Sequence, residues 1–346
     1  LAQINRHRPW SIFGAAPSAQ LGVLTKDPTF IEHRFKAMGG PASLVFAPPN
    51  NCEHVGADIV SEAKAILVDL ENRYSRYTDT SLVSLINERA GSKTPTVLDP
   101  EARGLLDFCS HLYRESDGLF DPTAGVLNQA WDFKRNQIPT DRVIDTILPR
   151  VGWDKVSIDE AGITLQVPHS ELDLGGIVKE YAADKVAALL RKTGVTKAII
   201  ELAGDIVTLG VKFDGQPWRV GVTDPNAPTQ TALSVALTDA CIATSGSSQR
   251  FIEINGQRYS HFLNPKTGHP VEGCFSVSVI ADSCLIAGGL ATIACLMGAT
   301  KGKTWLASSG LPWLIIEENQ WTGPISDHYS SEQSTEAPQR NVPSPR

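Results

Sequence analysis

The stretch DLGGIVKEYAADKVAALLRKTGVTKAIIEL, residues 173–202, decides the fold class of this chain. Its paired glycines, Gly175 and Gly176, open a segment with helical apolar spacing that ends at Gly194, a residue type that commonly terminates helices. The near-continuous apolar run Lys197–Leu202 then predicts a buried strand. With a strand closing at Asp173 and Leu174, the stretch predicts strand, turn, helix and strand in succession.

The same alternation of helices and strands extends outward on both sides. Apolar residues at helical spacing predict helices at 60–73, 100–116 and 284–297, the last capped by Asp282 or Ser283. Strands are predicted at 163–167, 275–281 and 313–317, and Asn255-Gly256 predicts a hairpin between 251–254 and 258–262. No repeat or linker interrupts residues 31–325, so we expect a single α+β domain with mixed or antiparallel sheets flanked by helices. Residues 1–30 are expected to be an N-terminal extension and residues 326–346 a solvated, disordered tail.

Composition restricts the class of protein. A net charge of −7 among 346 residues argues against a broad nucleic-acid footprint, and no apolar run reaches the roughly 20 residues of a transmembrane helix. The six cysteines are scattered without a CxxC pair, which favours free buried thiols and leaves the redox state open. Because the sequence begins at Leu1 rather than Met, we expect a processed or incomplete amino terminus, and export stays undecided.

The glycine turn before the predicted helix is the strongest local sign of a ligand site. Gly175 and Gly176 would let a phosphate approach exposed N–H groups at a helix start, with Lys179 adding a cation. The segment lacks the Walker A and GxGxxG patterns. Taken alone, it is more typical of a tight strand-to-helix turn with a solvated lysine.

Three further groups of residues carry possible chemistry. His261 ends the predicted hairpin and could serve as acid, base or phosphate donor, or simply be structural. Thr244, Ser245 and Gly246 offer hydroxyl and N–H groups suited to an anion nest, although such turns often only cap other elements. Oxygen ligands for a hard metal are available at Asp121, Asp173, Asp205 and Thr292, which could instead be caps and turn formers.

Taken in order, these segments resemble the ApbE family, the FAD:protein FMN transferases. The resemblance is carried by short motifs across about residues 35–300: Met38-Gly39-Gly40, Ser75-Arg76-Tyr77 with Ser81 and Asn87, Gly118–Thr123 with Trp131, Leu172–Asp184, Gly204-Asp205, Ala243–Gly246, Tyr259–Gly268 and Ala287–Thr292. Each motif is weak by itself, whereas eight in the same order are specific.

The resemblance implies that FAD lies among these loops. Positions matching flavin contacts of the family are Met38, Tyr77, Leu119, Phe120, Asp121, Asp173, Lys179 and Leu263, to which the Thr244-Ser245-Gly246 nest is added. Asp205 and His261 are the expected catalytic residues, and Gly176, Gly288 and Thr292 match the metal-binding positions. In the family, a magnesium ion polarises the FAD pyrophosphate, AMP leaves, and FMN is esterified to a threonine of an acceptor protein.

The sequence departs from the family pattern at the metal site. Family members carry an aspartate four residues before the threonine matched by Thr292, and this chain has Gly288 there, with Ala291 offering no replacement. Gly40 stands for the usual threonine. Glu180 stands for the glycine after the lysine and adds a negative charge beside the expected phosphates. The magnesium site is therefore expected to be weakened or absent.

Two functions stay open on the sequence. One is an active FAD:protein FMN transferase with a poorer metal site. The other is a non-catalytic FAD-binding protein acting as carrier, sensor or assembly factor. The resemblance also implies the bacterial periplasm or cell envelope, although no lipobox cysteine lies near Leu1.

Overall fold

The computed structural model describes residues 11–13, 30–133, 135, 137–225, 227–247, 251–254, 256–272, 275–317 and 320–326. Its helices are α1 (Glu53–Tyr74), α2 (Leu82–Glu88), α3 (Pro100–Glu115), α4 (Asp141–Ile147), α5 (Val178–Lys192), α6 (Cys284–Met297) and α7 (Ala299–Ser309), with a 3-10 segment, η2, at Pro122–Gln129. Its strands are β1 (Ser11–Phe13), β2 (Ile31–Ala37), β3 (Gly40–Phe46), β4 (Val156–Asp159), β5 (Gly162–Leu165), β6 (Ala198–Leu202), β7 (Asp205–Leu209), β8 (Trp218–Asp224), β9 (Ala227–Leu237), β10 (Cys241–Gly246), β11 (Phe251–Ile254), β12 (Gln257–Ser260), β13 (Phe275–Ala281), β14 (Trp313–Glu317) and β15 (Gln320–Thr322).

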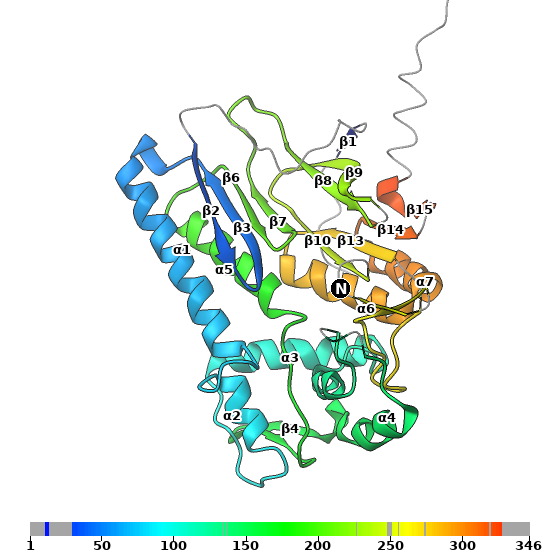
Figure 1. Ribbon diagram of the computed structural model, residues 1–346. Helices are drawn as coiled ribbons and strands as arrows, with labels where there is room; N and C mark the ends of the chain where they lie inside the picture. The colour runs from blue at the N-terminus through cyan, green and yellow to red at the C-terminus, as the bar shows by residue number, and fades with distance from the viewer. Residues whose placement is uncertain are drawn as a thin grey trace, which may run out of the picture.

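An eight-stranded sheet forms the centre of the molecule. Its strand order is β15-β14-β13-β10-β7-β6-β3-β2, and every neighbouring pair is antiparallel. Figure 1 shows α1, α5 and α6 along one side of this sheet, and α2, α3 and α4 gathered beyond one end of it. The architecture is α+β, as the sequence predicts, with antiparallel sheets.

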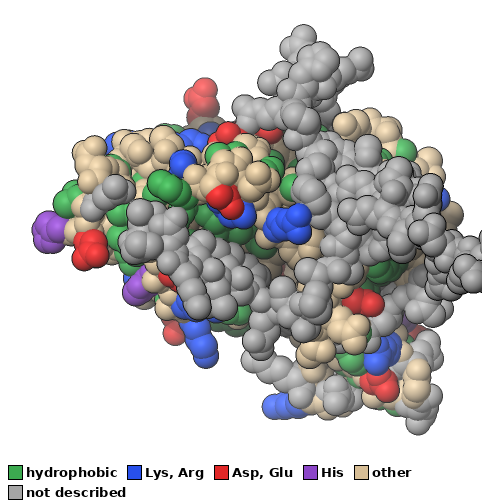
Figure 2. Space-filling view, turned by 90° about the horizontal axis from the view of Figure 1, so that it is seen from above, with side chains coloured by type: hydrophobic (Ala, Val, Ile, Leu, Met, Phe, Trp, Pro, Cys, Tyr) green, Lys and Arg blue, Asp and Glu red, His purple; other side chains and the backbone are tan. Residues whose placement is uncertain are grey.

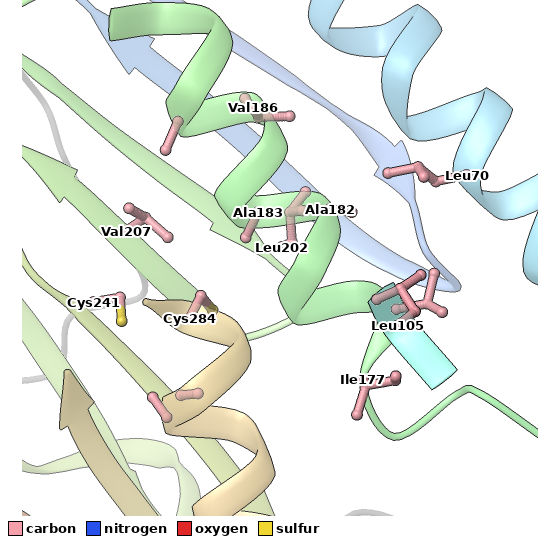
Figure 3. Packing of buried hydrophobic residues seen from close by; sticks show 14 of the residues in the cluster. Leu70, Leu105, Ile177, Ala182, Ala183, Val186, Leu202, Val207, Cys241 and Cys284 are labelled. Carbon is pink, nitrogen blue, oxygen red and sulfur yellow. The ribbon is translucent and has the colours of Figure 1, made fainter. Parts of the chain in front are cut away.

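The main core lies between the helices and the sheet. Small residues on α5, such as Ala182 and Ala183, let the helix approach strands that carry Leu202 and Val207 (Figure 3). Asp184 of α5 accepts hydrogen bonds from Ser283 Oγ and from the first two N–H groups of α6, which fixes the two helices together. These contacts fix the start of α6 against the middle of α5.

The opposite face of the sheet is covered by a second, three-stranded sheet of order β1-β9-β8. Alternate residues of β8, namely Trp218, Val220 and Val222, are buried against the central sheet, as expected for a strand with one solvated face. The candidate site therefore lies on the side of the central sheet that the helices cover.

A smaller cluster packs around Trp131 beyond the end of the central sheet. Trp131 Nε1 donates to the carbonyl of Gly268, 2.8 Å away, and the cluster also contains Leu127, Ile144 and Leu263. Gly268 has a positive φ of 73°, and a Cβ there would overlap Ile144. Only glycine therefore fits at this turn, which holds the loop after β12 against η2 and α4.

Several sequence predictions are confirmed at the level of single elements. Strands 275–281 and 313–317, helix 284–297 with Ser283 as its cap, and the hairpin around 255–256 form as predicted. Residue 255 itself lies outside the described residues.

Other expectations were wrong in detail. Asp173 and Leu174 form no strand but an irregular extended segment, because Asp173 N–H bonds to the carbonyl of Pro122 rather than to a ladder. Helix α5 begins at Val178, after a turn over Gly175-Gly176, rather than at the glycines. Helix α1 begins at Glu53, seven residues before the start predicted at residue 60.

The chain ends lie largely outside the description. Ser11–Phe13 pair with β9 inside the expected N-terminal extension, and Ser326, the first residue of the expected tail, is buried. Residues 1–10, 14–29 and 327–346 fall outside the described ranges.

The helices, thiols and surface charges show the following properties. Within the described ranges, helices are too short or too polar to cross a bilayer. Of the cysteines there, Cys52 is exposed and the other four are buried, all as free thiols, while Cys274 lies outside those ranges. Acidic and basic side chains are interspersed over the described part of the face in Figure 2.

Candidate functional site

Four loops far apart in sequence meet at one end of the central sheet. The β2–β3 turn at Met38-Gly39 lies beside the β6–β7 turn, because a Cβ at Gly40 would come within 2.5 Å of Ala203 Cβ. Asp205 Oδ1 accepts from the N–H of Thr244 at 3.1 Å, which adds the end of β10. The ion pair of Lys179 with Asp205 brings in the start of α5. The antiparallel pairing of the strands therefore brings these predicted site segments together.

The centre of this convergence is a group of three charges, Lys179, Glu180 and Asp205, called here the carboxylate cluster. Lys179 Nζ pairs with Asp205 Oδ2 and lies 3.0 Å from Glu180 Oε1. The Asp205 and Glu180 side chains are only 1% and 7% exposed. Asp205 and Lys179, predicted as catalytic and flavin-binding residues, are thus neighbours in a largely water-excluded place.

Helix α6 closes the cluster from the other side. A Cβ on Gly288 would overlap Glu180 Cγ and lie 3.0 Å from both Glu180 Cδ and Oε1. Thr292, one turn further along the same face, has its hydroxyl 3.0 Å from Ser245 Oγ of β10. The predicted metal positions Gly288 and Thr292 therefore flank the carboxylate cluster and the Thr244–Gly246 segment.

A second group forms around Arg76, which sequence reasoning had not singled out as a site residue. Its guanidinium donates to the carbonyl of Gly125 at 2.8 Å and pairs with Glu171 at 3.0 Å and Asp173 at 3.3 Å. Asp173 Oδ1 in turn accepts from Gly175 N–H at 2.8 Å. Arg76 therefore connects three loops and positions the glycine turn before α5. Its position between Ser75 and Tyr77 was the available signal.

The loop after α3 lies against the glycine turn. The ring of Phe120 would be 3.6 Å from a Cβ at Gly176, so these two predicted site residues touch. Asp121 accepts hydrogen bonds from Thr123 N–H and Oγ1 and from Trp153 N–H. Burial raises the pKa of the Asp121 carboxyl above its ordinary value, against the lowering effect of these hydrogen bonds. Its side chain is thus engaged by Thr123 and Trp153, and the N–H groups of Leu119 and Phe120 donate to Ser116.

The turn after β12 carries His261 and Leu263. The His261 ring is partly buried, with its centroid 4.3 Å from that of Phe262, and Leu263 is buried in the Trp131 cluster. Lys266 Nζ pairs with Asp117 Oδ2 at 2.8 Å, just before the loop after α3. Two predicted residues lie at the edge of this arrangement: Met38, with a positive φ of 53°, and Tyr77, which is 79% exposed.

The donors around the carboxylate cluster suit a magnesium ion that also binds phosphate oxygens. Glu180 Oε2 is buried and has no hydrogen-bond partner among the described residues. In the same part of the chain, no group of three or more His, Cys, Asp or Glu side chains could hold a metal by itself. Magnesium is commonly held by one or two carboxylates, with water and substrate phosphates completing six ligands. Glu180 and the Thr292 hydroxyl are the side chains that would hold it.

Comparison with known proteins agrees with this geometry. The model of the ApbE family matches residues 38–315. The chain is 32% identical over 262 residues to the FAD:protein FMN transferase of Treponema pallidum, covering 70% of this chain and 72% of that protein. It is 31% identical over 267 residues to that of Chlamydia trachomatis, covering 75% and 82%.

Solved structures give the same result. The flavinyl transferase ApbE of Pseudomonas stutzeri, in its apo form, matches with a TM-score of 0.76 and 28% identity, covering 87% of this chain and 96% of that one. The ApbE protein of Thermotoga maritima matches with a TM-score of 0.77 and 27% identity, covering 86% and 98%. The family model spans well over half of the sequence and includes every predicted site residue, and the chain therefore belongs to the ApbE family.

Proposed function

We propose that this chain is an FAD:protein FMN transferase, which cleaves FAD and esterifies FMN to a threonine hydroxyl of an acceptor protein. The observation that carries the proposal is the meeting of Lys179, Asp205 and the Thr244–Gly246 segment at the start of α5. A helix start with adjacent glycines and a lysine suits the pyrophosphate of FAD. The curated relatives carry the name of this activity, which favours it over the non-catalytic alternative.

The reaction is a phosphoryl transfer that the site residues would position. The acceptor threonine oxygen forms a bond to the FMN phosphorus, the pyrophosphate P–O bond breaks, and AMP leaves with its electron pair. Bound magnesium would supply charge neutralisation for the phosphates. Lys179 would hold the phosphates near the glycine turn, and Asp205 would orient Lys179.

His261 is our candidate for accepting the threonine proton. Asp205 is the other residue expected from the sequence to be catalytic, but its oxygens are already engaged by Lys179 and the Thr244 N–H. An imidazole can take up a proton near neutral pH, and general-base catalysis typically contributes about 10²- to 10⁴-fold. Asp205 is therefore assigned to positioning and His261 to proton transfer.

The proposal is tested by incubating the purified protein with FAD, magnesium and a protein known to carry threonine-linked FMN. We expect a fluorescent flavin band on the acceptor in a denaturing gel, and its loss with EDTA. Supplying FMN instead of FAD is the control, because FMN has no AMP to lose. A His261→Gln variant should form the adduct about 10²-fold or more slowly with FAD affinity unchanged.

Bound FAD without any adduct, at every magnesium concentration and with an acceptor that a known transferase modifies in parallel, would contradict the proposal. That outcome would favour the carrier, sensor or assembly role. Periplasmic or envelope localisation stays a prediction, testable by fractionating cells that express the full reading frame.

A further inference from the structure

The carboxylate cluster contains a buried oxygen with no partner. Glu180 Oε1 lies 3.0 Å from Lys179 Nζ, but Glu180 Oε2 is buried and lacks any hydrogen-bond partner among the described residues. Leaving a carboxylate oxygen desolvated and unpaired is costly in a folded protein. The arrangement is therefore suited to a further positive group beside Glu180.

The charges of the cluster point in the same direction. Two carboxylates, Glu180 and Asp205, face a single ammonium, Lys179, so the three together carry one net negative charge with little access to water. A buried uncompensated charge favours binding of a counter-ion. The nearby hydroxyl of Thr292 and the carboxylate oxygens are hard ligands, which Mg²⁺ and Mn²⁺ prefer.

Glu180 and Gly288 occupy one space between α5 and α6. The Cβ of any other residue at 288 would overlap Glu180 Cγ, so the glutamate fits only because position 288 has no side chain. The reverse also holds, because a carboxylate placed on α6 at 288 needs a small residue at 180. The two departures that the sequence shows separately, a glycine at 288 and a glutamate at 180, are thus one structural exchange.

We propose that Glu180 supplies the metal-binding carboxylate that position 288 lacks, so that the divalent site persists with its acidic ligand on α5 instead of α6. This inference rests on the proposed function for the identity of the phosphate ligand, since FAD would complete the coordination. It is an alternative to the expectation that Gly288 leaves the site weakened without local replacement. It also reassigns Glu180 from a repulsive neighbour of the phosphates to a ligand of their cation.

The test measures metal binding directly, with Mn²⁺ as the probe and electron paramagnetic resonance of free Mn²⁺ as the readout, in the presence and absence of FAD. Glu180→Gln should weaken Mn²⁺ binding at least 10-fold, while the circular dichroism spectrum and the FAD fluorescence quenching measured without metal stay unchanged. Glu253→Gln is the matched control, because Glu253 lies on the β11–β12 hairpin with its side chain 47% exposed. It should bind Mn²⁺ as the parent does.

The exchange itself is tested by moving the carboxylate back. Gly288→Asp alone should not improve Mn²⁺ binding, because the new side chain meets Glu180. The double variant Glu180→Gly with Gly288→Asp should bind Mn²⁺ within a few-fold of the parent. The inference is overturned if Glu180→Gln binds Mn²⁺ like the parent, or if Gly288→Asp alone binds it more tightly.

Failure of this inference can be told apart from failure of the proposed function. If FMN transfer proceeds in EDTA and the parent binds no Mn²⁺, the metal ligand is wrong while the transferase stands, with Lys179 acting in place of a metal ion. If Mn²⁺ binding depends on Glu180 but no adduct forms on a competent acceptor, the ligand assignment stands and the transferase assignment fails.

Discussion

Single residues at this site connect loops to one another, even where their own side chains are largely buried. Arg76 is the clearest case: its side chain is 13% exposed and contacts the carbonyl of Gly125 and the carboxylates of Glu171 and Asp173. The planar guanidinium can satisfy several acceptors at fixed angles, which a lysine ammonium cannot. Removing it would leave two carboxylates without their cation beside the glycine turn.

We expect Arg76→Ala to lower the free energy of unfolding by about 2 kcal/mol, the usual cost of losing hydrogen bonds to charged groups. It should also weaken FAD binding, because Asp173 orients the Gly175 N–H. Arg76→Lys should recover only part of both losses. Urea unfolding and fluorescence titration with FAD measure the two effects. Equal stability of all three proteins would contradict the bridging role.

At the scale of elements, capping residues help to define where the helices begin. Asp99 caps α3 by accepting from Ala102 N–H at 2.8 Å, and it also pairs with Arg73 of α1. The backbone hydrogen bond from Ala102, followed by the hydrogen bond from Arg73, lowers the pKa of Asp99 below its ordinary value of 3.8. The ionised carboxylate is therefore favoured by folding.

Asp99→Ala should reduce the free energy of unfolding by about 1 kcal/mol at pH 7, a typical cap contribution. Because the folded pKa is lowered, the contribution of the charge is present above the unfolded pKa and is lost as the pH falls through the folded one. The difference between parent and variant should thus shrink between about pH 5 and pH 2. Asp99→Asn, which keeps the cap, is the control, and denaturant unfolding at several pH values measures it. A difference that grows towards acid would have the wrong sign.

At the scale of the whole molecule, the candidate site is assembled from most of the chain. The β2–β3 turn, the Arg76 loop, the loop after α3, the start of α5 and the end of β10 each contribute, and they span residues 38–246 before the His261 turn is added. A ligand that contacts all of them stabilises the folded state and not the unfolded chain. Binding should consequently be visible as global stabilisation.

FAD at about 100 times its dissociation constant should add about 2.7 kcal/mol to the stability of the protein. For a domain of this size that corresponds to a rise of about 4 °C in Tm. Differential scanning fluorimetry, read at wavelengths clear of flavin emission, measures the shift, and riboflavin without phosphates should give a smaller one. No shift with FAD at high micromolar concentration would contradict binding at this site.

The sequence determined many of the elements and the loops that resemble those of the family. The spacing of apolar residues, the glycines that end helices and the Asn-Gly turn located β13, β14, α6 and the hairpin. These signals depend only on near neighbours in the chain. They failed at Asp173-Leu174, because the Asp173 N–H donates to the Pro122 carbonyl and Leu172, just before it, is paired with the Asn87 side chain. Hydrogen bonds to residues distant in the chain produce no local sequence pattern from which they could be predicted.

Only the tertiary structure decided how the site residues relate to one another. Gly288 and Glu180 are more than a hundred positions apart, and each looks like a separate loss or hindrance in the sequence. Packing of α5 on α6 places the glutamate side chain in the space that the glycine leaves. The sequence by itself determined the family-like loops and the missing carboxylate at 288. The close approach of two helices decided that another carboxylate stands beside it, because side-chain proximity across a core is set by packing and not by chain order.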